Sequence, residues 1–256
     1  MPTGLEPILP HVGPFLLVMF RLSGIFVFGP MFGSRLIPMQ LKALLVVVLA
    51  FCTYPLVPAQ AVSFESLPAM AFAVGSELLI GIIIGFGATL PLFALQLAGL
   101  IMGQQLGLGL ARVFNPDLEE ETEVVGQLLF LLALTVFIAA NGHHLMLAVL
   151  VRSFHSVPLG GYMPDSGLVV LMTGLLTSMF DLALRIAAPV LCLLFLETAA
   201  MGFIARTVQH LNILSLGFPL RILLGMGLLV AVVIHLAPAM LEAFRETMTA
   251  LMRLFG

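Results

Sequence analysis

Residues 68–111 read PAMAFAVGSELLIGIIIGFGATLPLFALQLAGLIMGQQLGLGLA, with Glu77 as their single charged side chain. As one helix this stretch would be about 66 Å long, whereas the hydrocarbon core of a bilayer is about 30 Å thick. The run at 168–203 has the same excess, since it would extend about 54 Å. Each run therefore either holds two elements or is partly buried in protein beyond the bilayer.

The rest of the chain is also strongly apolar. Hydrophobic residues make up 61% of its 256 positions and charged residues 9%, against roughly 45–50% and about 25% in soluble domains. Strands of a membrane barrel would be about 10 residues long and strictly alternating, so the longer runs favour helices. The sequence predicts an all-α, polytopic integral membrane protein of long, partly broken helices and helical hairpins, forming one membrane domain over 1–256. Its apolar runs are 12–32, 41–58, 68–111, 124–141, 168–203 and 212–240.

Charge and cysteine usage exclude several classes of function. The net charge is −3, and the basic residues are scattered singly, so no basic stripe could follow a nucleic-acid backbone. Cys52 and Cys192 lie in apolar runs, where we expect buried small side chains rather than a disulfide or a metal site.

The N-terminal region predicts how the chain enters the membrane. Glu6 and three prolines precede the first run without a basic segment, so we expect insertion through an uncleaved first span. Arg35 and Lys42 flank the first short loop, which places the 33–42 loop in the cytoplasm and the N-terminus outside. Beyond the second span the charge pattern gives no orientation.

Residues 242–256 form a distinct amphipathic pattern. Leu241, Phe244, Met248, Leu251 and Phe255 recur at helical spacing, and charged side chains fill the opposite face. Such a C-terminal helix could lie on the membrane or on a partner, or could be the end of a span reaching the interface.

Glycines recur every fourth residue in the central run. Gly81 and Gly85 form one such pair, and Gly99, Gly103 and Gly107 form a longer line. Glycine at this spacing clears one face of a helix, so another backbone can approach closely. We expect these positions to serve helix packing or assembly.

The glycine line leads into an apolar loop that ends at an Asn-Pro pair, which stops a helix. A loop between membrane elements cannot face lipid with unsatisfied backbone groups. It therefore either lines a pore or cavity, or is a buried connector. Its residues include Gly107, Leu108, Gly109, Leu110, Arg112, Val113, Phe114, Asn115, Pro116 and Asp117.

Six charged residues interrupt the apolar runs and would be costly against lipid, so we expect the chain to be covered by other protein. Asp181 and Arg185 stand four apart on one helical face, which predicts mutual neutralisation. Arg21 and Glu77 either pair between spans, which we favour, or mark an ion path. The six are Arg21, Glu77, Asp181, Arg185, Glu197 and Arg221.

No motif in the sequence indicates a catalytic function. It lacks a nucleophile elbow, a Walker-type loop and an H-E-x-x-H motif. His143 and His144 are adjacent in an Asn-Gly turn without nearby carboxylates, which disfavours a metal site. We expect no enzyme activity, no cofactor and no metal.

Several short motifs, taken in order, resemble the FliR family of flagellar type III export gates and its virulence-secretion relatives, over essentially the whole chain. Relatives usually carry Pro-Gln ahead of the last asparagine, where this chain has Gln209-His210. The motifs are Arg21-Leu-Ser-Gly24, Pro30-Met-Phe-Gly33, Gly75-Ser-Glu77 with Gly81 and Gly85, Ala98-Gly99 leading to Gly109, Asn115-Pro116, Asn141-Gly142-His143-His144, Ser153-Phe154, and Asn212 before Gly217-Phe218-Pro219-Leu220.

The resemblance implies a non-enzymatic subunit of an export gate in the bacterial inner membrane, at the flagellar basal body. It would assemble with FliP-like and FliQ-like subunits and with FlhB-like and FlhA-like components into a pore for unfolded flagellar proteins. The family's plug loop maps onto 107–117. Helical hairpins would be lifted out of the bilayer plane within the assembly, which would account for the overlong runs.

Three alternatives remain open at this point. A small-solute secondary transporter could use Arg21, Glu77 and the glycine-broken helix, but we find no convincing internal repeat. An intramembrane hydrolase would need a nucleophile with a partnered base. An injectisome subunit would share the export-gate plan, although the Gly-Phe-Pro-Leu stretch and the Asn-Gly-His-His turn favour a flagellar one.

Overall fold

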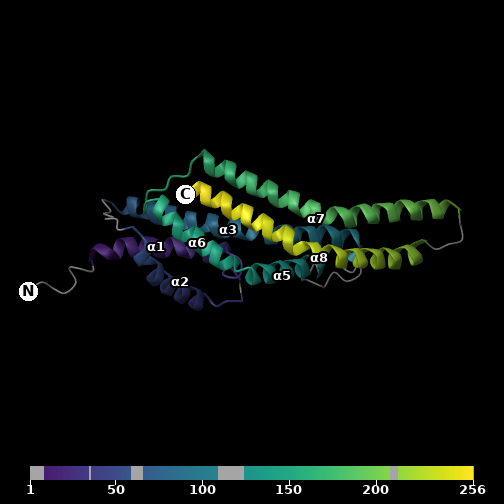
Figure 1. Ribbon diagram of the computed structural model, residues 1–256, viewed down its shortest axis with the longest axis horizontal. Coiled ribbons are helices and arrows are strands. Elements are labelled where there is room, and N and C mark those ends of the chain that lie inside the picture. Colours follow the sequence, from purple (N-terminus) through teal and green to yellow (C-terminus); the bar gives the residue numbers. More distant parts are fainter. Residues whose placement is uncertain (1–8, 35, 59–65, 109–123, 208–212, 256) are drawn as a thin grey trace, which may run out of the picture. The chain divides into compact units, whose positions relative to one another are not determined.

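A computed structural model describes residues 9–34, 36–58, 66–108, 124–207 and 213–255, and these residues form helices and connections without a strand (Figure 1). This confirms the all-α prediction. The helices are α1 (Leu9–Phe28), α2 (Met39–Thr53), α3 (Leu67–Gln105), α5 (Val124–Ala139), α6 (Gly142–Ser156), α7 (Ser166–Thr207) and α8 (Ile213–Phe255), with a 3₁₀ turn η1 (Tyr54–Leu56) after α2.

The two overlong runs form continuous helices. α3 has 39 residues and α7 has 42, which correspond to about 58 Å and 63 Å. Pro91 lies inside α3 and Pro189 inside α7, so neither proline divides its run into two helices. The most apolar part of α3 is 72% buried, against 28% for α7, so the protein itself covers most of α3.

Within the described part of the chain, five helices are long and apolar enough to cross a membrane: α1, α2 with η1, α3, α7 and α8. α5 and α6 could together form a sixth crossing, bent by 66°. Asn141, at the bend, has a left-handed φ of 55°. The sequence placed a turn at 141–144 but did not predict α6, which buries Met146, Val149, Leu150 and Phe154 on one face.

The chain divides into two compact units. Unit 1 comprises residues 1–90, 137–176 and 244–256, and unit 2 comprises 91–136 and 177–243. Four helices (α3, α5, α7 and α8) contribute residues to both. The prediction of one membrane domain over 1–256 stays a prediction.

The C-terminal amphipathic residues are the last turns of α8. Their apolar face is buried within unit 1, where the Phe244 ring lies 5.2 Å from the Phe137 ring and Phe255 lies 5.9 Å from Tyr162. Arg245 and Arg253 are exposed on the other face. This stretch of α8 therefore packs on its own chain.

Both cysteines are exposed, which corrects the expectation that they would be buried. Cys52 lies on α2 and Cys192 on α7, each on an outward face of an apolar helix. In a membrane protein an apolar neighbourhood in sequence does not require the interior, because lipid or partner helices also accept apolar faces.

Candidate functional site: a buried charge network in unit 1

α1 and α3 cross in unit 1 with their backbones in contact. A Cβ on Gly24 would lie 2.5 Å from the carbonyl oxygen of Leu78, and one on Gly81 would overlap the carbonyl oxygen of Arg21. One turn further along, a Cβ on Gly85 would lie 3.0 Å from the backbone nitrogen of Gly29. The glycines predicted for close packing at 81 and 85 therefore face α1 of the same chain.

Arg21 and Glu77 meet at this crossing, and both side chains are completely buried. The Nε of Arg21 donates to Oε2 of Glu77 at 2.5 Å, and NH2 donates to Oε1 at 3.0 Å. This two-point geometry is the strong form of an arginine–carboxylate pair. A buried pair of this kind adds little net stability over an apolar substitute, but removing one partner leaves an uncompensated charge.

The remaining donors of Arg21 tie α6 to the crossing. NH1 donates to Oγ of Ser153 at 3.0 Å, and NH2 donates to the carbonyl oxygen of Val157 at 3.3 Å. The guanidinium carbon of Arg21 also lies 4.4 Å from the ring centroid of Phe154, a cation–π contact. Ser153 and Phe154 were noted in the sequence only as a family motif, and their contact with Arg21 was not predicted.

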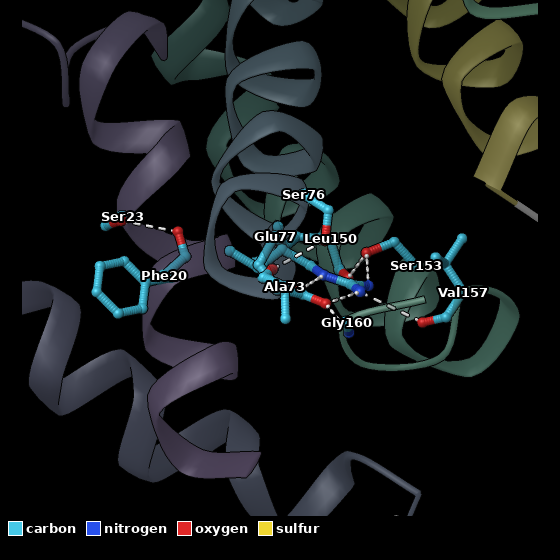
Figure 2. A network of polar contacts seen from close by, with 10 residues as sticks. Phe20, Ser23, Ala73, Ser76, Glu77, Leu150, Ser153, Val157 and Gly160 are labelled. Carbon is cyan, nitrogen blue, oxygen red and sulfur yellow. Dashed lines mark hydrogen bonds and ion pairs between the residues drawn. The ribbon is translucent and has the colours of Figure 1, made fainter. Parts of the chain in front are cut away.

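Glu77 holds the connection between α6 and α7. Its Oε1 accepts a hydrogen bond from the backbone nitrogen of Gly160 at 2.7 Å. Gly160 has a left-handed φ of 71°, a conformation that favours glycine. Figure 2 shows Glu77, Ser153, Val157 and Gly160 gathered in one polar cluster. The network therefore joins α1, α3, α6 and the following connection.

This arrangement acts as a structural anchor. Its two charges neutralise one another, their polar atoms have partners, and both side chains have no exposed surface. Of the two hypotheses for Arg21 and Glu77, the geometry supports pairing between spans over an ion path.

The other intramembrane charges also form pairs, both in unit 2. Asp181 and Arg185 approach to 2.7 Å on α7, with 55% and 76% of their side chains exposed. Arg221 on α8 donates to Glu197 on α7 at 3.2 Å. In Figure 1, α7 and α8 run beside one another there.

The Glu197–Arg221 pairing was missed at the sequence level. The two residues are almost equidistant from the connection between α7 and α8 at 208–212, so an antiparallel hairpin brings them together. Arg221 also donates to Oγ1 of Thr198 at 2.5 Å. The near-equal distance of Glu197 and Arg221 along the chain from residues 208–212 was the signal that could have identified the pair.

The second glycine line lies in unit 2. A Cβ on Gly99 would lie 2.7 Å from the Cα of Gly126 in α5, so this glycine also packs within the chain. A Cβ on Gly103 would meet Val125 at 3.5 Å, an ordinary contact. Gly103 is therefore much less constrained than Gly81.

The predicted plug loop lies mostly outside the described residues. Gly107, with a left-handed φ of 77°, and Leu108, 39% exposed, follow the end of α3. Gly109, Leu110, Arg112, Val113, Phe114, Asn115 and Pro116 fall outside the described residues, as do Arg35 and Gln209-His210.

Two further polar features lie in unit 1: the adjacent rings of His143 and His144, and the phenol of Tyr162. The His143 and His144 rings lie 4.3 Å apart, and the described residues hold no group of three metal-ligating side chains. In the α6–α7 connection, burial raises the pKa of Tyr162 above its ordinary value, and the nearby negative charge of Asp165 raises it further. Neither feature forms a catalytic arrangement.

Comparison with known proteins gives a consistent result. The sequence pattern of "Bacterial export proteins, family 1" matches residues 12–247. The flagellar biosynthetic protein FliR of Bacillus subtilis (strain 168) is 31% identical over 251 residues, covering 94% of this chain and 95% of that protein. FliR of Escherichia coli (strain K12) is 32% identical over 218 residues, covering 85% and 83%. The Yop proteins translocation protein T of Yersinia pestis is 28% identical over 219 residues, covering 84% of each.

Proposed function

This chain belongs to the family of bacterial export proteins, family 1, and from that premise we propose that it is a structural subunit of the membrane apparatus that exports flagellar proteins. One observation carries the proposal: the similarity to a flagellar biosynthetic protein extends over 94% of this chain and 95% of that protein. The related Yersinia translocation protein makes a virulence-type export apparatus the second candidate.

The physical character of the chain supports a role in a protein assembly. α7 and α8 are each about twice as long as a hydrocarbon core requires. Both also expose large apolar side chains, such as Phe195 and Leu223. A solute transporter built on Arg21 and Glu77 is less well supported, because these residues are fully buried and bonded to one another.

The proposed mechanism is passive. The helices would form part of the wall of an export pore, and the apolar loop at 107–117 would close the pore at rest. Apolar side chains in a constriction exclude water and hence ions. On this proposal Leu108, Leu110, Val113 and Phe114 form the seal, Gly107 and Gly109 let it move, and no residue catalyses a reaction.

The proposed partners follow from the same role. FliP-like and FliQ-like subunits would complete the pore, with FlhB-like and FlhA-like components beside it. The pore would lie in the bacterial inner membrane at the flagellar basal body, and unfolded flagellar proteins would be its cargo.

A genetic test separates this function from the alternatives. Deleting the gene should abolish the secretion of flagellar subunits and motility, and the wild-type gene should restore both. A chain purified from native membranes should co-elute with other membrane subunits of the export apparatus. A deletion strain that secretes flagellar subunits normally, or a chain that elutes alone, would refute the proposal.

A further inference from the structure

α2 turns a line of large apolar residues outward. Its members recur at spacings of three and four, so they lie along one side of the helix, and each is between 46% and 66% exposed. Val46, Ala50 and Thr53 lie on the other side and are buried. We call the exposed side the α2 face, and it consists of Leu41, Leu44, Val48 and Phe51.

The side chains of the α2 face suit lipid better than a packed helix. Helices that pack closely in a membrane meet through small residues, which let their backbones approach. The α2 face contains no glycine, alanine or serine, and none of its side chains has a polar group. α7 differs, because it exposes the Asp181–Arg185 pair, which would be costly against lipid.

The length of α2 matches the thickness of a bilayer. α2 and η1 together form an apolar segment of 18 residues, Met39–Leu56. As a helix this segment is about 27 Å long, and the hydrocarbon core of a bilayer is about 30 Å thick. α3 has 39 residues and α7 has 42, so both are longer than hydrocarbon can cover.

Residues typical of the membrane–water interface lie at both ends of this segment. Lys42 is in the first turn of α2, and a long basic side chain near a helix end extends to the lipid headgroups. At the other end, Nδ1 of His11 and the hydroxyl oxygen of Tyr54 lie 2.8 Å apart. Tyrosine is enriched at the headgroup level of membranes.

α1 and α2 build the second of these ends together, where they run beside one another in unit 1 (Figure 1). The Phe15 ring of α1 lies 4.9 Å from the Phe51 ring and 5.7 Å from the Tyr54 ring. His11 is exposed at the edge of this stack. An apolar body with a wet polar tip is the arrangement that a membrane interface favours.

We propose that the α2 face is a lipid-contact surface. The acyl chains of the bilayer cover Leu44 to Phe51, Lys42 lies at the phosphate groups of one leaflet, and the His11–Tyr54 pair lies at the headgroups of the other leaflet. The partner of this surface is bilayer lipid and not a protein helix. The inference goes beyond the proposed function, because it does not depend on what the apparatus exports.

Site-specific photocrosslinking in native membranes tests the identity of the partner. Val48 and Phe51 are replaced, one at a time, by p-benzoylphenylalanine, and the products are analysed by mass spectrometry. We expect both probes to form phospholipid adducts and no protein adducts. Solubilisation in detergent before illumination is the control, and it should lower the adduct yield at least about tenfold, since detergent replaces the surrounding lipid. An adduct with another membrane protein, or with a second copy of this chain, would overturn the proposal.

Cysteine labelling tests where the interface lies along α2. Cys52 is exposed two residues before Tyr54, and Leu56 is 57% exposed two residues after it. Cys52 is labelled in a Cys192→Ala background, and Leu56→Cys in a chain that also carries Cys52→Ala. A membrane-impermeant maleimide should label Leu56→Cys at least about tenfold faster than Cys52, because the reactive thiolate forms in water and not in hydrocarbon.

Tyr54 itself should hold this boundary in place. Tyr54→Ala should raise the labelling rate of Cys52, and Tyr54→Trp, which keeps an interfacial aromatic ring, should leave the rate low. Equal labelling rates at Cys52 and at Leu56→Cys would overturn the placement of the His11–Tyr54 pair at the headgroups. A Cys52 rate that Tyr54→Ala does not change would overturn the role of Tyr54 as an anchor.

Discussion

Two arginine–carboxylate pairs of this protein occupy opposite environments. Arg21 and Glu77 have no exposed surface and lie in a network that includes Ser153, Val157 and Gly160. Asp181 and Arg185 lie on α7 with more than half of each side chain exposed. The first pair takes its partners from its own chain and has no exposed surface, whereas the second lies open on the surface of its helix. The same chemistry is thus enclosed by protein in unit 1 and exposed in unit 2.

Breaking the buried pair should have the largest effect. Arg21→Leu leaves the Glu77 carboxylate buried without its cation, so we expect a destabilisation of about 3–5 kcal/mol. Arg21→Leu with Glu77→Leu should be milder than either single change, because no isolated charge remains. Denaturation of the purified chain in detergent measures these differences. A double variant that is less stable than both single variants would contradict the anchor interpretation.

The helix crossing that holds this pair should be the next most sensitive point. Gly81→Ala places a methyl group against the Arg21 carbonyl, so we expect a loss of about 1–3 kcal/mol. Gly103→Ala is the matched control on the same helix, and there alanine should be neutral or stabilising by up to about 1 kcal/mol. Unfolding midpoints of the two variants give the comparison. Equal effects would mean that the α1–α3 contact is not tight.

The exposed pair should matter little for the stability of the isolated chain. Asp181→Asn removes an exposed pair within one helix, so the change in the purified chain should be within about 0.5 kcal/mol. The measurement is the unfolding midpoint of the purified chain in detergent, compared with Arg21→Leu. A loss as large as that of Arg21→Leu would remove the distinction between the two pairs.

The smallest effect is a pH dependence of unit 1. Because burial raises the pKa of Tyr162 above the ordinary value of 10.0, the folded state holds the phenol proton more tightly than the unfolded state. Stability should therefore fall as pH rises above about 10, and Tyr162→Phe should remove this component. Tyrosinate absorbance in a Tyr54→Phe background follows the titration. A phenol that titrates at or below its ordinary pKa would contradict the burial of Tyr162.

The sequence was sufficient for the helical class, because long apolar runs dominate it, but it left open whether α3 and α7 would each be one helix or two. It did not predict α6, whose histidines and arginine lower the average apolarity of its segment. Met146, Val149, Leu150 and Phe154 fall on one face of a helix, and this spacing could have predicted α6. It also ended the last span near 240, whereas α8 continues through Pro219 and Pro238 to Phe255.

The candidate site was predictable only in part. Arg21 and Glu77 are visible as charges in apolar runs, and Gly81 as a close-packing position. The partners from the α6–α7 connection were not predictable, because the sequence does not show which backbone N–H group, such as that of Gly160, will donate to a buried carboxylate. The sequence also could not show that the glycines pack against their own chain rather than a partner, because this depends on how α1 and α5 pack on α3.

Removing the arginine of each pair and comparing the products tests the central contrast most directly. The full chain is isolated from native membranes as Arg21→Leu and as Arg185→Leu, and the amount of folded chain is measured for each variant. We expect Arg21→Leu to give much less folded chain, because the Glu77 carboxylate is left buried without its cation. We expect Arg185→Leu to give a normal amount of folded chain, because the Asp181 side chain is exposed. Equal losses of folded chain in the two variants would contradict the account.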